Sequence, residues 1–148
     1  MLRTITEEDR KQYLSMCEDF YASDAVDHPV SPDHFVRTFD AALSGSPFVT
    51  CLMAEREGET VGYVLLAHTW SQEAGGETVW VEELYILPQH RGKGLGTGIL
   101  AQIRQRYPKT ARVRLEVCPD NIRARALYEK LGFKELNYGQ MVADYGCN

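Results

Sequence analysis

The order of hydrophobic and polar residues predicts a series of short helices and strands along the first 88 positions of the chain. Tyr13, Leu14, Cys17 and Phe20 recur at helical spacing and would form the apolar stripe of one helix. The later apolar runs have strand length, and their connections are too short for parallel crossovers, so we expect an antiparallel meander. The elements predicted here are a strand at 2–5, helices at 6–22 and 33–43, and strands at 48–56, 60–70 and 78–87.

The pattern changes beyond Pro88, where strands and helices alternate. Leu95, Ile99 and Ile103 lie on one face of a helix that starts in a glycine-rich stretch. Because this helix connects two strands, those strands are expected to run parallel. The remaining predicted elements are a helix at 95–107, a strand at 111–117, a helix at 121–133, and final strands at 133–137 and 139–145.

These elements place the chain in the α/β (α+β) class, as a single domain over residues 1–148. We expect a mixed, mostly antiparallel, twisted sheet of about seven strands with helices on both faces. The net charge of −5 argues against nucleic acid or an anionic membrane as a partner, because both favour basic surfaces. The apolar runs are too short to span a bilayer, and the acidic start of the chain does not resemble a secretory signal.

The four cysteines predict reduced thiols and no metal site. Cys17, Cys51, Cys118 and Cys147 lie far apart, without the spacing of metal ligands. We therefore expect a cytoplasmic protein.

The most informative stretch is QHRGKGLGTG at 89–98, which has four glycines where a helix begins. Unpaired N–H groups and the positive end of the helix dipole make such a position an anion site, most naturally for phosphate. The alternative is a glycine-rich turn that packs closely on the sheet. The stretch fits neither the P-loop pattern nor the dinucleotide fingerprint G-x-G-x-x-G, because residue 97 is threonine.

These residues resemble the GNAT superfamily of acyl-CoA-dependent N-acyltransferases. The family's pyrophosphate loop reads Q/R-x-x-G-x-G/A, and residues 89–94 satisfy every position. The flanking segments VEELYIL and NIRARALYEKLGF are also similar to the family's fourth strand and fourth helix. The resemblance implies acetyl-CoA as cosubstrate. It also implies a central pair of parallel strands, in which the fourth strand splays away from its neighbour.

The resemblance also implies roles in CoA binding. Backbone amides of 92–97 would hold the pyrophosphate, and Arg91 and Lys93 would support it. Backbone groups of Leu84 and Ile86 would pair with the pantetheine arm and polarise the thioester carbonyl. Gly98 is expected to allow close packing of the helix on the sheet instead of ligand binding. The residues assigned to CoA are Leu84, Ile86, Gln89, Arg91, Gly92, Lys93, Gly94, Leu95, Gly96, Thr97, Asn121 and Tyr128.

Acyl transfer to an amine requires a base for the amine and an acid for the departing thiolate. Strict alternation puts Glu82 on the face of Trp80, Leu84 and Ile86, an apolar setting that would raise its pKa, so we predict Glu82 as the base. Glu83 would point the other way, although a β-bulge could reverse this parity. Both could instead be surface carboxylates at the end of a strand.

Tyr128 matches the family's thiolate-protonating tyrosine. It could also be a core aromatic stacked on Phe133, and the two roles are compatible. The helix that carries Tyr128 should be capped by Asp120 or Asn121 and should end at Gly132.

The acceptor is the least determined part of the prediction. Tyr21, Asp24, Asp27 and Asp33 surround the connection between the first two helices and would favour a cationic amine, although a solvated acidic loop explains them equally well. We expect a small-molecule primary amine as acceptor, and a homodimer is possible. The alternatives are a protein or peptide amine, a catalytically silent acyl-CoA-binding module, and a module that binds nucleotide phosphate.

Overall fold

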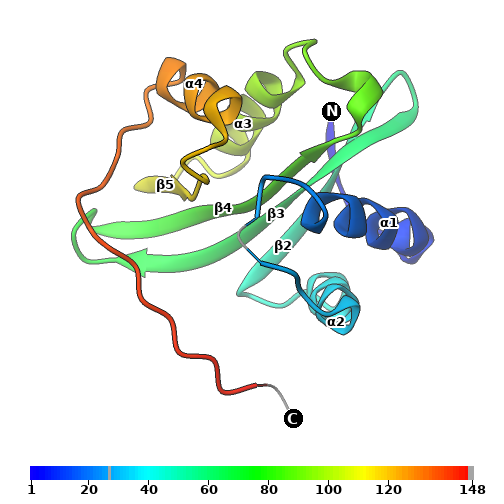
Figure 1. The fold of residues 1–148 in the computed structure, drawn as a ribbon, viewed down its shortest axis with the longest axis horizontal. Coiled ribbons are helices and arrows are strands. Elements are labelled where there is room, and N and C mark those ends of the chain that lie inside the picture. Colours follow the sequence, from blue (N-terminus) through cyan, green and yellow to red (C-terminus); the bar gives the residue numbers. More distant parts are fainter. Residues whose placement is uncertain (27, 147–148) are drawn as a thin grey trace.

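A twisted five-stranded sheet with strand order β1-β2-β3-β4-β5 forms the middle of the molecule (Figure 1). The computed structural model describes residues 1–26 and 28–146, so Asp27 and Cys147 lie outside the described part. The strands are β1 (Leu2–Thr4), β2 (Val49–Arg56), β3 (Glu59–Ser71), β4 (Gly76–Ile86) and β5 (Arg112–Leu115). The helices are η1 (Glu7–Asp9), α1 (Arg10–Tyr21), α2 (Pro32–Leu43), η2 (Pro88–His90), α3 (Leu95–Arg106) and α4 (Ile122–Lys130).

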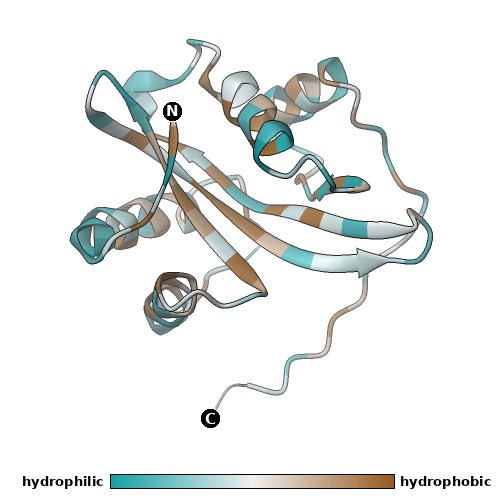
Figure 2. Cartoon of the chain, turned by 180° about the vertical axis from the view of Figure 1, so that it is seen from behind, coloured by the Kyte–Doolittle hydropathy of each residue, from teal (hydrophilic) through white to brown (hydrophobic). Residues whose placement is uncertain are grey.

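Helices cover both faces of the sheet, as the sequence predicts (Figure 1). The apolar stripe of α1 packs with α2 on one face, where Tyr13 and Phe39 are almost completely buried. On the other face Ile99 and Ile103 of α3 pack against Val79 and Val81 of β4. Figure 2 shows brown positions along the middle of the sheet, where residues 51–54 of β2 and 61–66 of β3 are all buried because helices cover both faces.

The antiparallel meander and the parallel pair are both confirmed. Strands β2, β3 and β4 pair antiparallel, and β4 pairs parallel with β5. The parallel register covers only 78–81 of β4, although β4 continues to Ile86. The second half of β4 therefore has no partner strand on this side, and the two strands diverge.

A β-bulge interrupts β4 at Glu82. Leu66 pairs with Val81 and Leu65 pairs with Glu83, so Glu82 has no opposite residue on β3. The bulge reverses the alternation of side chains along β4: Leu84 and Ile86 pack with Val79 and Val81 on the α3 face. The prediction from strict alternation, which grouped Leu84 and Ile86 with Trp80, is wrong for this reason.

The two final strands predicted at 133–137 and 139–145 are absent, which corrects the expected count from about seven strands to five. The described end of the chain runs past β5 and away from the sheet (Figure 1), and Met141 and Tyr145 are almost fully exposed. One physical reason is that β5 is only four residues long, so it offers few backbone groups to a further strand. The parallel pair consequently lies at an edge of the sheet, and the expectation of a central pair is wrong.

Candidate active site

The glycine-rich loop forms a backbone cradle at the start of α3. Gly92 and Gly94 both have φ of +76°, a left-handed conformation that side chains with a Cβ resist. Gly94 is the N-cap of α3, and the Gly98 amide donates the first intrahelical bond, to the Gly94 carbonyl at 3.1 Å. The amides of the first turn precede this bond and therefore remain available for an anion.

The space around each glycine separates their roles. A Cβ at Gly94 would meet no atom within 4 Å, so the cradle is open above this residue. A Cβ at Gly96 would lie 3.1 Å from Leu127 Cδ2, so Gly96 allows α3 to approach α4. A Cβ at Gly98 would also meet no atom within 4 Å. The expectation that Gly98 allows close packing of the helix on the sheet is therefore wrong, and Gly96 is the residue that allows close packing, against α4.

Three cationic residues surround the cradle. Arg91 Nε donates to the Ile86 carbonyl at 2.7 Å, and Lys93 Nζ donates to the Gln89 carbonyl at 3.0 Å. Arg123 of α4 was not predicted, yet its Nη2 atom lies 3.2 Å from the position of a Cβ at Gly92. The sequence shows that Arg123 is a cationic residue in the first turn of α4. Its proximity to the loop depends on how α4 packs beside α3.

The unpaired half of β4 presents backbone groups beside this cradle. Leu87 N donates to Val61 O at 2.9 Å, so the backbone of residue 87 faces β3. The backbone N–H and C=O groups of successive residues in an antiparallel strand point to opposite sides. Those of Tyr85 therefore also point to β3, and those of Leu84 and Ile86 point to the gap on the other side of β4. The Arg91 bond to the Ile86 carbonyl agrees with this assignment. These are the two residues to which the family resemblance assigns the binding of an extended ligand.

The cradle and the free strand edge line one cleft of about 670 Å³. Tyr128 of α4 and the N-cap residue Asn121 lie on its wall, as does Asp24 in the turn after α1. The sequence did not assign Phe20, Ser23 or Ala25 to the site; these residues reach the cleft because α1 ends there. Gln89 and Lys93 are not among its lining residues. Further lining residues are Leu84, Tyr85, Ile86, His90, Arg91, Gly92, Gly94, Leu95, Gly96, Thr97, Asp120, Ile122, Arg123, Ala124 and Leu127.

The ends of α4 fix the place of Tyr128. The Asn121 side chain accepts from Ala124 N at 3.2 Å and caps the helix. At the other end Gly132 has φ of +89°, Phe133 N donates to Tyr128 O and Gly132 N donates to Glu129 O, each at 3.0 Å. These two bonds form a Schellman motif, as the sequence predicts. The Phe133 ring meets Tyr128 edge to face with centroids 5.8 Å apart.

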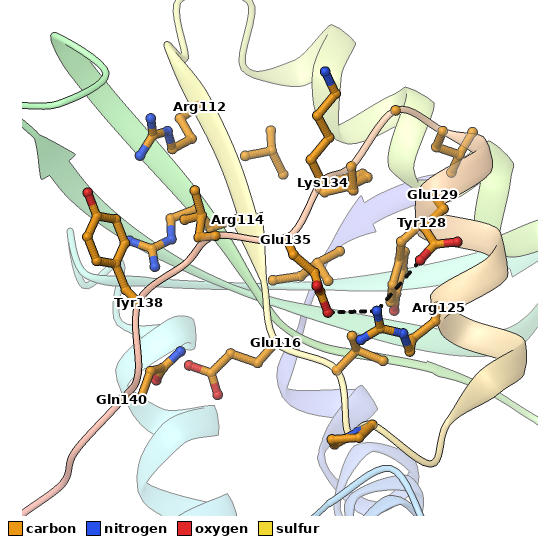
Figure 3. Close-up of a pocket in the computed structure, with 18 residues that line it drawn as sticks. Arg112, Arg114, Glu116, Arg125, Tyr128, Glu129, Lys134, Glu135, Tyr138 and Gln140 are labelled. Atoms are coloured by element: carbon orange, nitrogen blue, oxygen red, sulfur yellow. Dashed lines mark hydrogen bonds and ion pairs between the residues drawn. The ribbon is translucent and has the colours of Figure 1, made fainter.

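Tyr128 lies between α4 and β5 (Figure 3) and also lines a groove of about 1030 Å³ beyond β5. Burial raises the pKa of the Tyr128 phenol, so the group stays protonated at neutral pH. In the same groove, Arg125 makes ion pairs with Glu129 and Glu135 (Figure 3). The Tyr128 phenol is therefore a protonated group on the wall of the cleft.

The two glutamates of the bulge have different environments. Glu82 is exposed and lies outside the lining of the cleft. Partial desolvation raises the pKa of the Glu82 carboxyl, and the charges of Glu116 and Glu83 raise it further. Glu83 is 8% exposed and accepts hydrogen bonds from Tyr21 and Tyr63 on the α1 side of the sheet. Burial raises the pKa of Glu83 despite these bonds.

The residues predicted at the acceptor side are only partly brought together. Asp24 lines the cleft, whereas Asp33 lies in the first turn of α2, exposed. The Tyr21 hydroxyl is occupied by Glu83, and Asp27 is outside the described residues. Glu116 adds a carboxylate that the sequence did not indicate, since its charge acts on Glu82.

The described residues 1–26 and 28–146 show neither a metal cluster nor a membrane-spanning helix. Within them, no group of three or more His, Cys, Asp or Glu side chains could hold a metal ion. Within the same part of the chain, no helix is long and apolar enough to cross a membrane.

A glycine cradle at a helix N-terminus, beside the free edge of a splayed strand, is an arrangement suited to an extended, phosphate-bearing ligand. The sequence model of the acetyltransferase (GNAT) family matches residues 10–133, and the chain belongs to this family. It is an acetyl-CoA-dependent N-acetyltransferase that acts on amines.

Three known proteins show the range of similarity. The chain is 28% identical to thialysine N-epsilon-acetyltransferase of Mus musculus, over 91% of this chain and 84% of that protein. It is 30% identical to spermine/spermidine N(1)-acetyltransferase of Bacillus subtilis, over 53% of this chain and 55% of that protein. The crystal structure of a predicted acetyltransferase with acetyl-CoA from Clostridium acetobutylicum has the same fold, with a TM-score of 0.77 and 16% identity over 97% of this chain and 95% of that one.

Proposed function

We propose that this enzyme transfers the acetyl group of acetyl-CoA to a primary amine of a small cationic molecule, by direct attack in a ternary complex. One observation carries the proposal: the phosphate cradle, the free edge of β4, Tyr128 and Asp24 all belong to one cleft. A pyrophosphate on the cradle would let an extended arm follow β4 toward the bulge that holds Glu82.

Within this proposal each residue has one task. The first-turn amides of α3, with Arg91 and Arg123, bind the pyrophosphate. Backbone groups of Leu84 and Ile86 hold the extended arm, and an amide of this edge polarises the thioester oxygen. Asn121 keeps the start of α4 in place, because its side chain caps that helix.

The bound acetyl-CoA supplies a thioester that an amine can attack, so that a carbon–nitrogen bond forms and the carbon–sulfur bond breaks. Glu82 takes one proton from the attacking nitrogen, directly or through a water. Tyr128 gives its phenolic proton to the departing sulfur. The products are the N-acetyl amide and the CoA thiol. Exchange with water then removes the proton from Glu82 and returns one to Tyr128.

A cationic small amine is the proposed acceptor, because carboxylates lie on the cleft wall and around the bulge. Asp24 lines the cleft, and Glu116 and Glu83 act electrostatically on Glu82. The two curated relatives described above are named for thialysine and for spermine/spermidine, which supports an amine of this kind. Turnover on lysine-containing peptides alone, in a screen that includes diamines and amino acids, would contradict this choice. The cytoplasm remains the predicted compartment, because the spacing of the cysteines predicts reduced thiols.

Replacing Glu82 with glutamine tests the assignment of the base. We expect kcat to fall by about 10²- to 10⁴-fold, because general base catalysis typically contributes that much. In the parent enzyme the acidic limb of kcat/KM should lie above pH 4.5, the ordinary pKa of glutamate, since the Glu82 pKa is raised. This limb should disappear in Glu82→Gln. Release of CoA thiol, followed as a function of pH, measures both effects.

The matched control is Glu77→Gln, which removes another exposed carboxylate from the same strand. It should keep kcat within about twofold, as expected for a surface substitution away from the site. An unchanged rate in Glu82→Gln would refute the role of Glu82. If both variants and the parent release no thiol with any amine, the chain is a silent acyl-CoA-binding module.

A further inference from the structure

Glu83 is a buried carboxylate whose hydrogen-bond partners are two neutral phenols. Tyr21 donates to Oε1 at 2.6 Å and Tyr63 donates to Oε2 at 2.5 Å, so both carboxylate oxygens are satisfied. The residue is 8% exposed and faces the core between the sheet and α1. Burying a carboxylate costs free energy, which hydrogen bonds offset only in part. An apolar residue would fill this position at lower cost, so a further role is indicated.

The two phenols connect Glu83 to the elements around the acceptor side of the cleft. Tyr21 is the last residue of α1, and its ring lies 5.0 Å from that of Phe35 in α2. The chain directly after Tyr21 supplies Asp24 to the wall of the cleft. Tyr63 lies on β3, with its ring 5.9 Å from that of Tyr85 on β4. Glu83 therefore joins the end of α1, β3 and β4 at one point.

This point lies beside the bulge. Glu82 has no opposite residue on β3, so the cross-strand pairs that hold it are those of Val81 and Glu83. We propose that Glu83 is a positioning residue: by binding Tyr21 and Tyr63 it fixes the bulge, and with it the Glu82 carboxylate and the end of α1 that carries Asp24. This inference rests on the proposed role of Glu82 as base.

In the same arrangement the charge of Glu83 contributes to the raised pKa of Glu82. The titratable groups that act on or face Glu83 are Tyr13, Cys17 and Tyr21 of α1, Cys51 of β2, Tyr63 of β3, and Glu82 itself. Glu116 acts on Glu82 from beyond β5. Removing the Glu83 charge leaves desolvation and Glu116 in place and takes away one contribution that raises the Glu82 pKa.

The test combines three nearly isosteric variants, Glu83→Gln, Tyr21→Phe and Tyr63→Phe. Each should lower kcat/KM for the amine by about 10- to 100-fold, since small displacements of reacting groups cost rates of this order. Because the cradle and the unpaired edge of β4 are untouched, KM for acetyl-CoA should stay within about twofold of the parent value. In Glu83→Gln the acidic limb of the pH profile should also move to lower pH, an effect that loss of stability alone would not produce.

Tyr13→Phe is the matched control. It removes the hydroxyl of a buried tyrosine in the same aromatic cluster, whose ring centroid lies 5.0 Å from that of Tyr63. It does not remove a hydrogen bond to Glu83. It should keep both kcat and the acidic limb. Thermal unfolding identifies any variant that fails to fold. Tyr21 lies at a partly exposed helix end, so Tyr21→Phe still tests the proposal if a more deeply buried variant does not fold.

The two proposals fail in different ways. If the acidic limb persists in Glu82→Gln, the assignment of the base is wrong. If Glu82→Gln abolishes the limb but folded Glu83→Gln and Tyr21→Phe keep the parent rate and limb, Glu83 has no positioning role.

Discussion

Tyr128 combines a structural contact with a chemically useful hydroxyl. Its ring meets Phe133 edge to face, and its backbone carbonyl accepts the Phe133 amide in the Schellman motif. The hydroxyl takes no part in either interaction. Burial keeps the phenol protonated near neutral pH, since it raises a pKa whose ordinary value is already 10.0. The core role and the acid role predicted from the sequence are therefore compatible at this residue.

Replacing Tyr128 with phenylalanine separates these roles. The ring contact with Phe133 is kept, so we expect the free energy of unfolding to change by no more than about 1 kcal/mol. The rate of thiol release should fall by about 10²-fold, the lower end of the general acid–base range. Steady-state kinetics and urea unfolding measure the two quantities. A folded variant with the parent rate would restrict Tyr128 to the structural role.

At the scale of elements, the site depends on how α3 begins. The turn after β4 places Gly92 and Gly94 in left-handed conformations, and Gly94 caps the helix. Gly96 then lets Leu127 of α4 approach α3. The glycine-rich stretch therefore contains two kinds of position: those that shape and open the cradle, and one that permits helix packing.

Gly94→Val should abolish CoA binding while the protein still folds. Valine at φ of +76° is strained, and its side chain would occupy the open space of the cradle. We expect at least about a 100-fold weaker Kd for CoA in calorimetry, equivalent to about 2.7 kcal/mol. Unchanged CoA affinity would exclude this loop as the pyrophosphate site.

Gly98→Ala is the control for this substitution. A Cβ at this position meets no atom within 4 Å, and the residue lies inside α3. Alanine should therefore keep the CoA affinity and raise the free energy of unfolding by up to about 1 kcal/mol, the difference in helix propensity.

At the scale of the whole molecule, the N-terminal strand is held to the start of the helical layer by a charged cluster. Asp9 is 6% exposed and accepts from Nη1 and Nη2 of Arg3, both at 2.7 Å, and from the Thr6 amide at 2.7 Å. Arg3 also pairs with Glu55 of β2. The hydrogen bonds from Arg3 are the main cause that lowers the pKa of Asp9, and the Thr6 amide adds to the effect.

A lowered pKa in the folded state gives Asp9 a definite pH dependence. Its contribution to stability is present above the ordinary pKa of 3.8 and is lost as the pH falls through the folded value. Asp9→Asn should therefore cost about 1–3 kcal/mol at pH 7, and the difference from the parent should shrink below pH 3.8. Urea unfolding of both proteins at pH 7, 4 and 3 measures this difference.

Comparing variant with parent matters here, because the raised pKa of Glu83 acts in the opposite direction. Its penalty is absent below the ordinary pKa of 4.5 and grows as the pH rises through the folded value. Glu7→Gln, which breaks an exposed pair with Arg10, should change stability much less than Asp9→Asn, because solvent screens that pair. A constant cost of Asp9→Asn at all three pH values would contradict the role of its charge.

The sequence by itself determined the elements up to α4, the class of the fold and the position of the glycine-rich loop at the start of α3. Those features follow from local causes: apolar periodicity, the capping residue Asn121, and glycines at left-handed positions such as Gly94 and Gly132. The resemblance of residues 89–94 to a known loop then indicated the cosubstrate.

Tertiary structure alone decided which face each glutamate of the bulge occupies, because one unpaired residue in β4 reverses the alternation. It also decided that Gly96 packs against α4 while Gly98 does not, and that Arg123 reaches the cradle. The final segment reads as strand, yet forming a strand requires a partner edge, which the short β5 does not provide to it. Periodicity records what a residue favours locally, whereas pairing register and packing depend on neighbours that are distant in the sequence.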